Sequence, residues 1–155
     1  MADITPERKQ AVQASWALVR KNMRTHAMDF FVFFFERHPD YQKAFKDFKD
    51  IPKEDLKNQA KFRGHAVRVF FAITSLVDNL DDLDIVVDIL QKTARDHVPR
   101  GITGAHYENL FATILAFLAN TLKDAFDAKT RDGWEVIAKV ILSVIQGELK
   151  TLGAA

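Results

Sequence analysis

The sequence predicts an all-α protein, and three observations indicate this class. Apolar residues recur at helical spacing along most of the chain, and no segment alternates convincingly between apolar and polar residues with a period of two. All four prolines stand where a helix would begin or end. The 155 residues contain no internal repeat and no long linker, and they suffice for one ordinary domain. We therefore expect a single domain over residues 1–155, with six long helices and one or two short ones.

In the first half of the chain, prolines mark the ends of the predicted helices. A Thr-Pro pair at residues 5–6 can open a helix that runs to about residue 22. A second helix holds residues 28–37 and ends ahead of Pro39, because the residue before a proline is biased out of the helical region. A short helical turn follows this proline, residues 44–51 form a compact connection, and a long helix occupies residues 54–79.

In the second half, charge and glycine mark the boundaries. The acidic segment 78–84 suits the amino-terminal end of a helix, which we expect over residues 83–97. A further helix occupies residues 103–122, with a threonine as its first residue to cap it. Residues 123–133 are expected to form a loop, and a last helix runs over residues 134–152.

Each long helix has an apolar face that we expect to pack inward. Thirteen phenylalanines add large apolar surfaces without a polar group, which suit a dry core or a dry pocket. The predicted inward residues are Val12, Trp16, Val19, Phe62, His65, Ala66, Val69, Ala72, Ile73, Leu76, Leu83, Val86, Val87, Leu90, Ala94, His97, Trp134, Ile137, Ile141, Val144 and Ile145.

Composition excludes several classes of protein. Twenty-two basic and 21 acidic residues leave a net charge of +1 with no basic stripe, which argues against a nucleic acid or a membrane surface as partner. The absence of cysteine excludes disulfides and thiolate metal sites. The apolar runs at residues 30–35 and 114–119 are too short to span a bilayer. The amino terminus has no apolar signal segment, so we expect a cytoplasmic protein.

Two of the five histidines lie on inward faces. His26, His38 and His106 stand near helix ends, and we expect no functional role for them. His65 and His97 lie on the apolar faces of two consecutive helices. One reading is a pair of core histidines, each bonded to a backbone carbonyl.

A cofactor is the other reading of this histidine pair. No cysteine or acidic residue shares the two apolar faces, so the pair makes a poor zinc site. It better suits a planar cofactor whose metal has four in-plane ligands and needs one axial imidazole. Pro99 and Gly101 prevent the helix from continuing beyond His97.

Four motifs follow one another along the chain. The first is Trp16 in the first helix, and the second is "RHPDYQKAFKDF", in which Phe45 stands six residues after a proline. The third is "KFRGHAVRVF" around His65, and the fourth is "LQKTARDHVPRGI" around His97. In this order and at these spacings they resemble the globin family over essentially the whole chain. The longer segment between the two histidines is more similar to neuroglobin and invertebrate intracellular globins than to vertebrate muscle and blood globins.

The resemblance implies a globin fold around a pocket for haem b. His97 would be the proximal iron ligand, and His65 the distal residue that donates a hydrogen bond to O2 or, in a six-coordinate form, binds the iron itself. An acceptor one turn earlier, a backbone carbonyl or a side chain such as Thr93, should orient His97 through its Nδ1–H. Phe31, His65 and Val69 would surround the O2 ligand. The residues that would contact haem are Phe45, Phe48, Phe62, His65, Arg68, Val69, Leu90, His97, Arg100, Ile102, Tyr107 and Leu110.

Individual positions carry further expectations. Phe45 would stack on the porphyrin, and Arg68 and Arg100 would pair with its propionates; a solvated surface charge is the alternative for both arginines. Two positions depart from the commonest vertebrate pattern: Ala66 stands where glycine often occurs, and Phe31 stands where leucine does. Phe31 would either crowd the O2 ligand or simply fill the core.

The function implied is reversible O2 binding for storage or transport, with no catalytic residue and no enzymatic role. O2, CO and NO are the expected ligands, and the chain could be a monomer or a homodimer. Three alternatives stay open. They are a haem enzyme that performs nitric oxide dioxygenation or a peroxidase-like reaction, a six-coordinate sensor, and a helical interaction module without cofactor.

Overall fold

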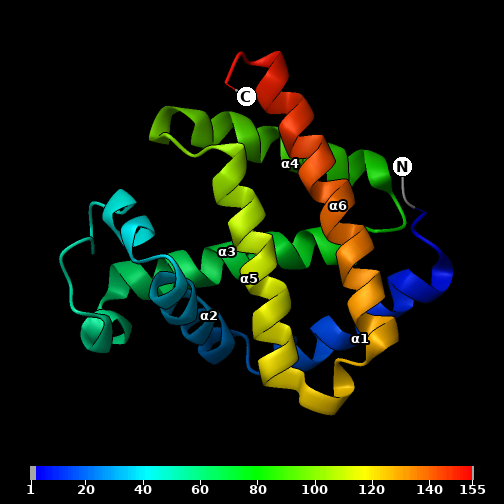
Figure 1. Ribbon diagram of the computed structural model, residues 1–155, viewed down its shortest axis with the longest axis horizontal. Helices are drawn as coiled ribbons and strands as arrows, with labels where there is room; N and C mark the ends of the chain where they lie inside the picture. The colour runs from blue at the N-terminus through cyan, green and yellow to red at the C-terminus, as the bar shows by residue number, and fades with distance from the viewer. Residues whose placement is uncertain (1–2, 155) are drawn as a thin grey trace. The chain divides into compact units, whose positions relative to one another are not determined.

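The described part of this computed structural model, residues 3–154, contains helices and no β-strand. Its six α-helices confirm the predicted class and the six long helices (Figure 1). They are α1 Pro6–Arg20, α2 Met23–Arg37, α3 Ala60–Asp78, α4 Leu83–His97, α5 Gly104–Leu122 and α6 Ala128–Thr151. Four short 3-10 helices join them, of which two are single turns of three residues. They are η1 Pro39–Ala44, η2 Lys53–Asn58, η3 Val98–Arg100 and η4 Lys123–Ala125.

The predicted helix over residues 54–79 is wrong in its first turn. Residues 53–58 form the separate helix η2, and α3 begins only at Ala60. Gln59 between them is extended, with φ −93° and ψ 120°, so the two segments cannot be continuous. The second helix also differs from its prediction, since α2 begins at Met23 rather than 28. Residues 23–27 are mostly polar and show no apolar face, so periodicity does not reveal this turn.

The predicted loop over residues 123–133 is also wrong, because α6 begins at Ala128. The Asp127 side chain caps the helix by accepting a hydrogen bond from the Thr130 amide at 2.9 Å. This bond lowers the pKa of Asp127. Gly133, which suggested a loop, lies inside the helix, and a Cβ atom there would stand 2.9 Å from the carbonyl oxygen of Arg8. Glycine therefore allows two backbones to approach closely.

The chain folds as two compact units. The first comprises the residues up to Trp16 together with Ser75 onwards, and the second comprises residues 17–74. In the first unit α6 packs against α4 and α5. The rings of Trp16 and Trp134 lie 5.7 Å apart, and the Trp134 indole donates a hydrogen bond to the Ser15 hydroxyl at 2.8 Å. One domain over residues 1–155 stays a prediction.

The second unit has an aromatic core. Phe30, Phe35, Phe62 and Phe70 have almost no exposed surface. Phe30 contacts Phe70 with ring centroids 5.5 Å apart, which joins α2 to α3. Its contact with Phe34, at 5.8 Å, is stacked. Aromatic pairs of this kind contribute beyond their buried area.

Most of the predicted inward residues are buried or half-buried, but two are exposed. Ala72 faces solvent, because the buried face of α3 passes through Phe70 and Ile73 instead. Leu83 is the first residue of α4 and also lies exposed, beside the acidic segment that precedes the helix. The apolar face predicted for α3 was therefore too wide, and the one predicted for α4 included an exposed first residue.

Candidate haem site

The end of α4 places His97 as the sequence predicts. The helix begins at the cap Asp82, whose side chain accepts a hydrogen bond from the Ile85 amide, and it ends at His97. The single turn η3 follows, and the chain then reverses at Gly101, whose φ of 77° lies in the left-handed region that favours glycine. The predicted stop by Pro99 and Gly101 is confirmed.

The imidazole of His97 is oriented from its own helix. Its Nδ1 atom lies 2.7 Å from the backbone carbonyl oxygen of Thr93. Because a carbonyl only accepts hydrogen bonds, Nδ1 donates to it, and in the neutral imidazole Nε2 then keeps its lone pair. The Thr93 hydroxyl donates instead to the carbonyl of Ile89 at 2.8 Å. The backbone, and not the threonine side chain, is thus the acceptor that was expected one turn earlier.

Tyr107 lies next to His97 in the same unit. The two ring centroids are 6.3 Å apart in an edge-to-face arrangement. Tyr107 is buried, and its hydroxyl has no hydrogen-bond partner in the described part of the chain. Burial raises the pKa of this phenol to about 12. A buried hydroxyl without a partner costs free energy, and it is typical of a site that a bound group completes.

His65 lies in the second unit, in α3, with three phenylalanine rings around it. Its ring centroid is 4.9 Å from Phe31 and 4.7 Å from Phe45, both edge-to-face, and 6.0 Å from Phe48. Phe31 and Phe48 are buried. Phe48 also meets the buried ring of Phe62 at 5.5 Å. The structure thus joins His65 to Phe31, Phe45 and Phe48, three of the residues predicted to lie near the haem or its ligand.

The other residues predicted to contact haem differ in their exposure to solvent. Leu90 is buried, whereas Val69, Ile102 and Leu110 are half-buried. The backbone amide of Ile102 donates a hydrogen bond to the His97 carbonyl at 3.4 Å, which closes the turn after α4. Arg68 and Arg100 are exposed. Contacts of these residues with haem stay predictions.

The donor set fits haem better than a free metal ion. In the described part of the chain no group of three or more His, Cys, Asp or Glu residues could hold a metal. A tetrapyrrole brings four nitrogen ligands of its own, so it needs from the protein only one imidazole with a free lone pair. His97 offers this at Nε2.

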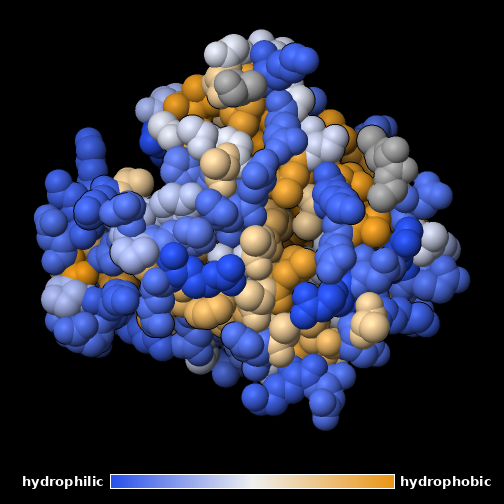
Figure 2. All heavy atoms as spheres, in the orientation of Figure 1, coloured by the Kyte–Doolittle hydropathy of each residue, from blue (hydrophilic) through white to orange (hydrophobic). Residues whose placement is uncertain are grey.

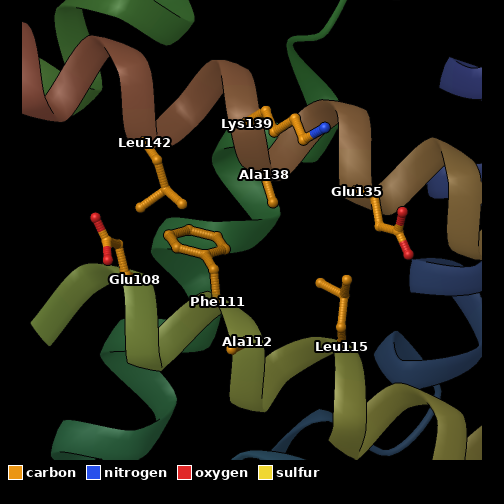
Figure 3. Close-up of a pocket in the computed structure, with 8 residues that line it drawn as sticks. All are labelled: Glu108, Phe111, Ala112, Leu115, Glu135, Ala138, Lys139 and Leu142. Carbon is orange, nitrogen blue, oxygen red and sulfur yellow. The ribbon is translucent and has the colours of Figure 1, made fainter. Parts of the chain in front are cut away.

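A separate groove lies in the first unit, between α5 and α6 (Figure 3). Its volume is about 290 Å³. None of the residues predicted to contact haem lines it. Figure 2 shows apolar surface along this part of the molecule, flanked by hydrophilic residues. The groove is lined by Glu108, Phe111, Ala112, Leu115, Glu135, Ala138, Lys139 and Leu142.

The family model for globins matches residues 28–145. The chain belongs to the globin family. It is 28% identical over 152 residues to a protein named globin from Nerita albicilla, covering 98% of this chain and 97% of that protein. It is 28% identical over 146 residues to hemoglobin-3 of Phacoides pectinatus, covering 94% of each. It is 31% identical over 130 residues to a globin of Busycotypus canaliculatus, covering 81% of this chain and 88% of that protein.

Membership in this family makes the chain a haem-binding globin, and globins bind diatomic gases such as O2. The resemblance and the all-α globin fold expected from the sequence are thereby confirmed. In residues 3–154, no helix of this globin has the length and apolar character needed to cross a membrane.

Sequence reasoning missed one residue of this globin that bears on the surroundings of His65. Gln42 is buried in η1 and donates hydrogen bonds from Nε2 to the carbonyl oxygens of Phe48 and Ile51, at 2.9 and 2.8 Å. A glutamine in a short polar turn carries no sequence signal of burial, since most glutamines are exposed.

Proposed function

We propose that this globin binds haem b and carries O2 reversibly, for storage or transport inside the cell. The observation that supports the proposal best is the hydrogen bond between His97 Nδ1 and the Thr93 carbonyl. Bonds of this kind fix the tautomer and ring orientation of a metal-ligating histidine and raise its basicity. Haem iron supplies the gas-binding chemistry when bound, and His97 is the residue that we propose as its protein ligand.

His65 is proposed as the distal residue that donates a hydrogen bond to O2. Bound O2 draws electron density from ferrous iron, so a donor stabilises it more than it stabilises CO. A hydrogen bond to such a charged acceptor contributes about 1.5–3 kcal/mol. The phenylalanines around the His65 ring support this role, because they restrict its orientation and keep water from it.

Apolar burial is proposed to hold the haem itself. The residues that we expect to contribute are Phe45, Phe48, Phe62, Leu90, Ile102 and Tyr107. Excluding water from their side chains stabilises the complex by about 25 cal/mol for each Å² of apolar surface buried. Arg68 and Arg100 are proposed as partners of the propionates.

Oxygen binding and dissociation of the purified globin test this proposal. A carrier should bind O2 reversibly, release it on deoxygenation and remain ferrous over many cycles, with autoxidation slow relative to O2 exchange. Rapid oxidation in each cycle, with fast turnover of nitric oxide or peroxide in the presence of a reductant, would support the enzymatic alternative instead.

A further inference from the structure

The loop between η1 and η2 has little backbone support of its own. Two amide hydrogen bonds lie within it, and each closes a single turn. The Phe48 N–H donates to the Phe45 carbonyl and the Ile51 N–H donates to the Phe48 carbonyl, both at 3.2 Å. Phe45 itself is extended, with φ −108° and ψ 98°. A segment with only two such bonds is expected to open locally at low cost in free energy.

Gln42 supplies the missing support. Its amide nitrogen has two hydrogens, and these bond to the carbonyl oxygens of Phe48 and Ile51 at 2.9 and 2.8 Å. Both partners are acceptors, so the amide has only one orientation that satisfies them. The side chain is buried, where hydrogen bonds are stronger than in water. One side chain thus ties the beginning of the loop to its end.

The two phenylalanines of this loop pack against the imidazole of His65. Phe45 and Phe48 stack on each other with centroids 5.0 Å apart, and both contact the imidazole of His65. Phe31 of α2 packs against the same imidazole. If the loop moves, two of these three aromatic contacts move with it, and the imidazole gains room to rotate.

We propose that Gln42 is a positioning residue for the distal side of the haem site: by clamping residues 45–51 it holds Phe45 and Phe48 against His65 and so fixes the direction of the imidazole. The part of this inference that concerns haem ligands rests on the proposed function. The clamp itself concerns only residues of this chain and can be tested without cofactor.

The variant Gln42→Met tests the clamp, because it keeps the length of the side chain but removes both donors. Gln13→Met is a matched control: Gln13 also donates from Nε2 to a backbone carbonyl, that of Val77 at 3.0 Å, but in the other unit. In the apoprotein, hydrogen exchange of the Phe48 and Ile51 amides should quicken roughly ten- to thirty-fold in Gln42→Met, from the loss of two buried hydrogen bonds. It should stay within about two-fold of wild type in Gln13→Met.

The carbonmonoxy form then tests the effect on His65. The infrared stretch of bound CO reports the electrostatic field of the distal side chain, so one orientation of His65 should give one dominant narrow band. Gln42→Met should split or broaden this band, whereas Gln13→Met should leave it unchanged. Gln42→Leu, which also lacks both donors and cannot ionise, should resemble Gln42→Met in both measurements.

The clamp and its effect on His65 can be refuted separately. Equal exchange rates in wild type and Gln42→Met would overturn the clamp. Faster exchange with an unchanged CO band would overturn the positioning role. A wild-type protein that takes up no haem would contradict the proposed function and leave the exchange result standing.

Discussion

The Nδ1 atom of His97 and the backbone carbonyl oxygen of Thr93 lie 2.7 Å apart, one helical turn from each other in α4. The acceptor belongs to the main chain, so it cannot be removed by changing a side chain. The helix therefore sets the tautomer of the histidine through its own geometry, whatever residue stands at position 93.

Thr93→Val should consequently leave the orientation of the His97 imidazole unchanged. The substitution removes only the hydroxyl bond to the Ile89 carbonyl and keeps the Thr93 carbonyl. We expect the iron–histidine stretching frequency of the ferrous protein, measured by resonance Raman, to match that of wild type. A clear shift would show that the threonine hydroxyl, rather than the main chain, orients His97.

His65→Val should raise the O2 dissociation rate about ten- to a hundred-fold, because the hydrogen bond to bound O2 is lost. Autoxidation should also quicken. Flash photolysis or stopped-flow mixing measures the first, and visible absorbance over hours measures the second. CO dissociation serves as the control, since CO gains little from a distal donor; an unchanged O2 rate would remove His65 from this role.

Tyr107→Phe should alter the alkaline stability of the apoprotein. Burial penalises the ionised phenol, so its folded pKa of about 12 lies above the ordinary value of 10.0; the unfolded chain ionises first, and the fold loses stability as the pH rises from 10 to 12. Between pH 9.5 and 11.5 the free energy of unfolding of wild type should therefore fall by about 1–2 kcal/mol more than that of the variant. Denaturant titrations at each pH measure it, and parallel curves would contradict the buried phenol.

At neutral pH the same substitution should be neutral or slightly stabilising, because it removes a buried hydroxyl that has no partner in residues 3–154. A large loss of stability at pH 7 would mean that the hydroxyl is satisfied in the folded protein.

Gly133→Ala should destabilise the fold by about 1–3 kcal/mol, the usual cost of overpacking. Its Cβ atom would meet the Arg8 carbonyl oxygen at 2.9 Å, and backbone atoms cannot easily move away. Gly147→Ala is the control in the same helix, because nothing lies within 4 Å of its Cβ position. That variant should be neutral or stabilised by up to about 1 kcal/mol. Urea denaturation compares the two, and equal effects would refute the close approach of α6 to α1.

The sequence was sufficient to predict elements whose signals are local. Helical periodicity identified the six long helices, and Pro39, Pro99 and Gly101 marked two of their ends correctly. The failures have local and tertiary causes: the polar first turn of α2 gives no periodic signal, whereas at the start of α6 a tertiary contact overrode the local one. Gly133 suggests a loop until the close passage of Arg8 explains it.

For the candidate site, residue types on apolar faces and the globin resemblance were enough to single out His65 and His97. Sequence did not decide between the carbonyl and the hydroxyl of Thr93, because both stand one turn before His97. It also missed Gln42, whose importance depends on two carbonyl groups six and nine residues further along the chain. Every residue has a backbone carbonyl, so the sequence does not show which carbonyls accept these hydrogen bonds.

The absorption spectrum of the ferrous, deoxygenated protein tests the central claim most directly, namely that this globin binds haem through His97. Wild type reconstituted with haem should show an intense Soret band and the spectrum of five-coordinate, histidine-ligated iron. His97→Gly should lose that spectrum, and added imidazole should restore it by occupying the vacated position. A wild-type protein without a Soret band, or a His97→Gly variant with the wild-type spectrum, would contradict the claim.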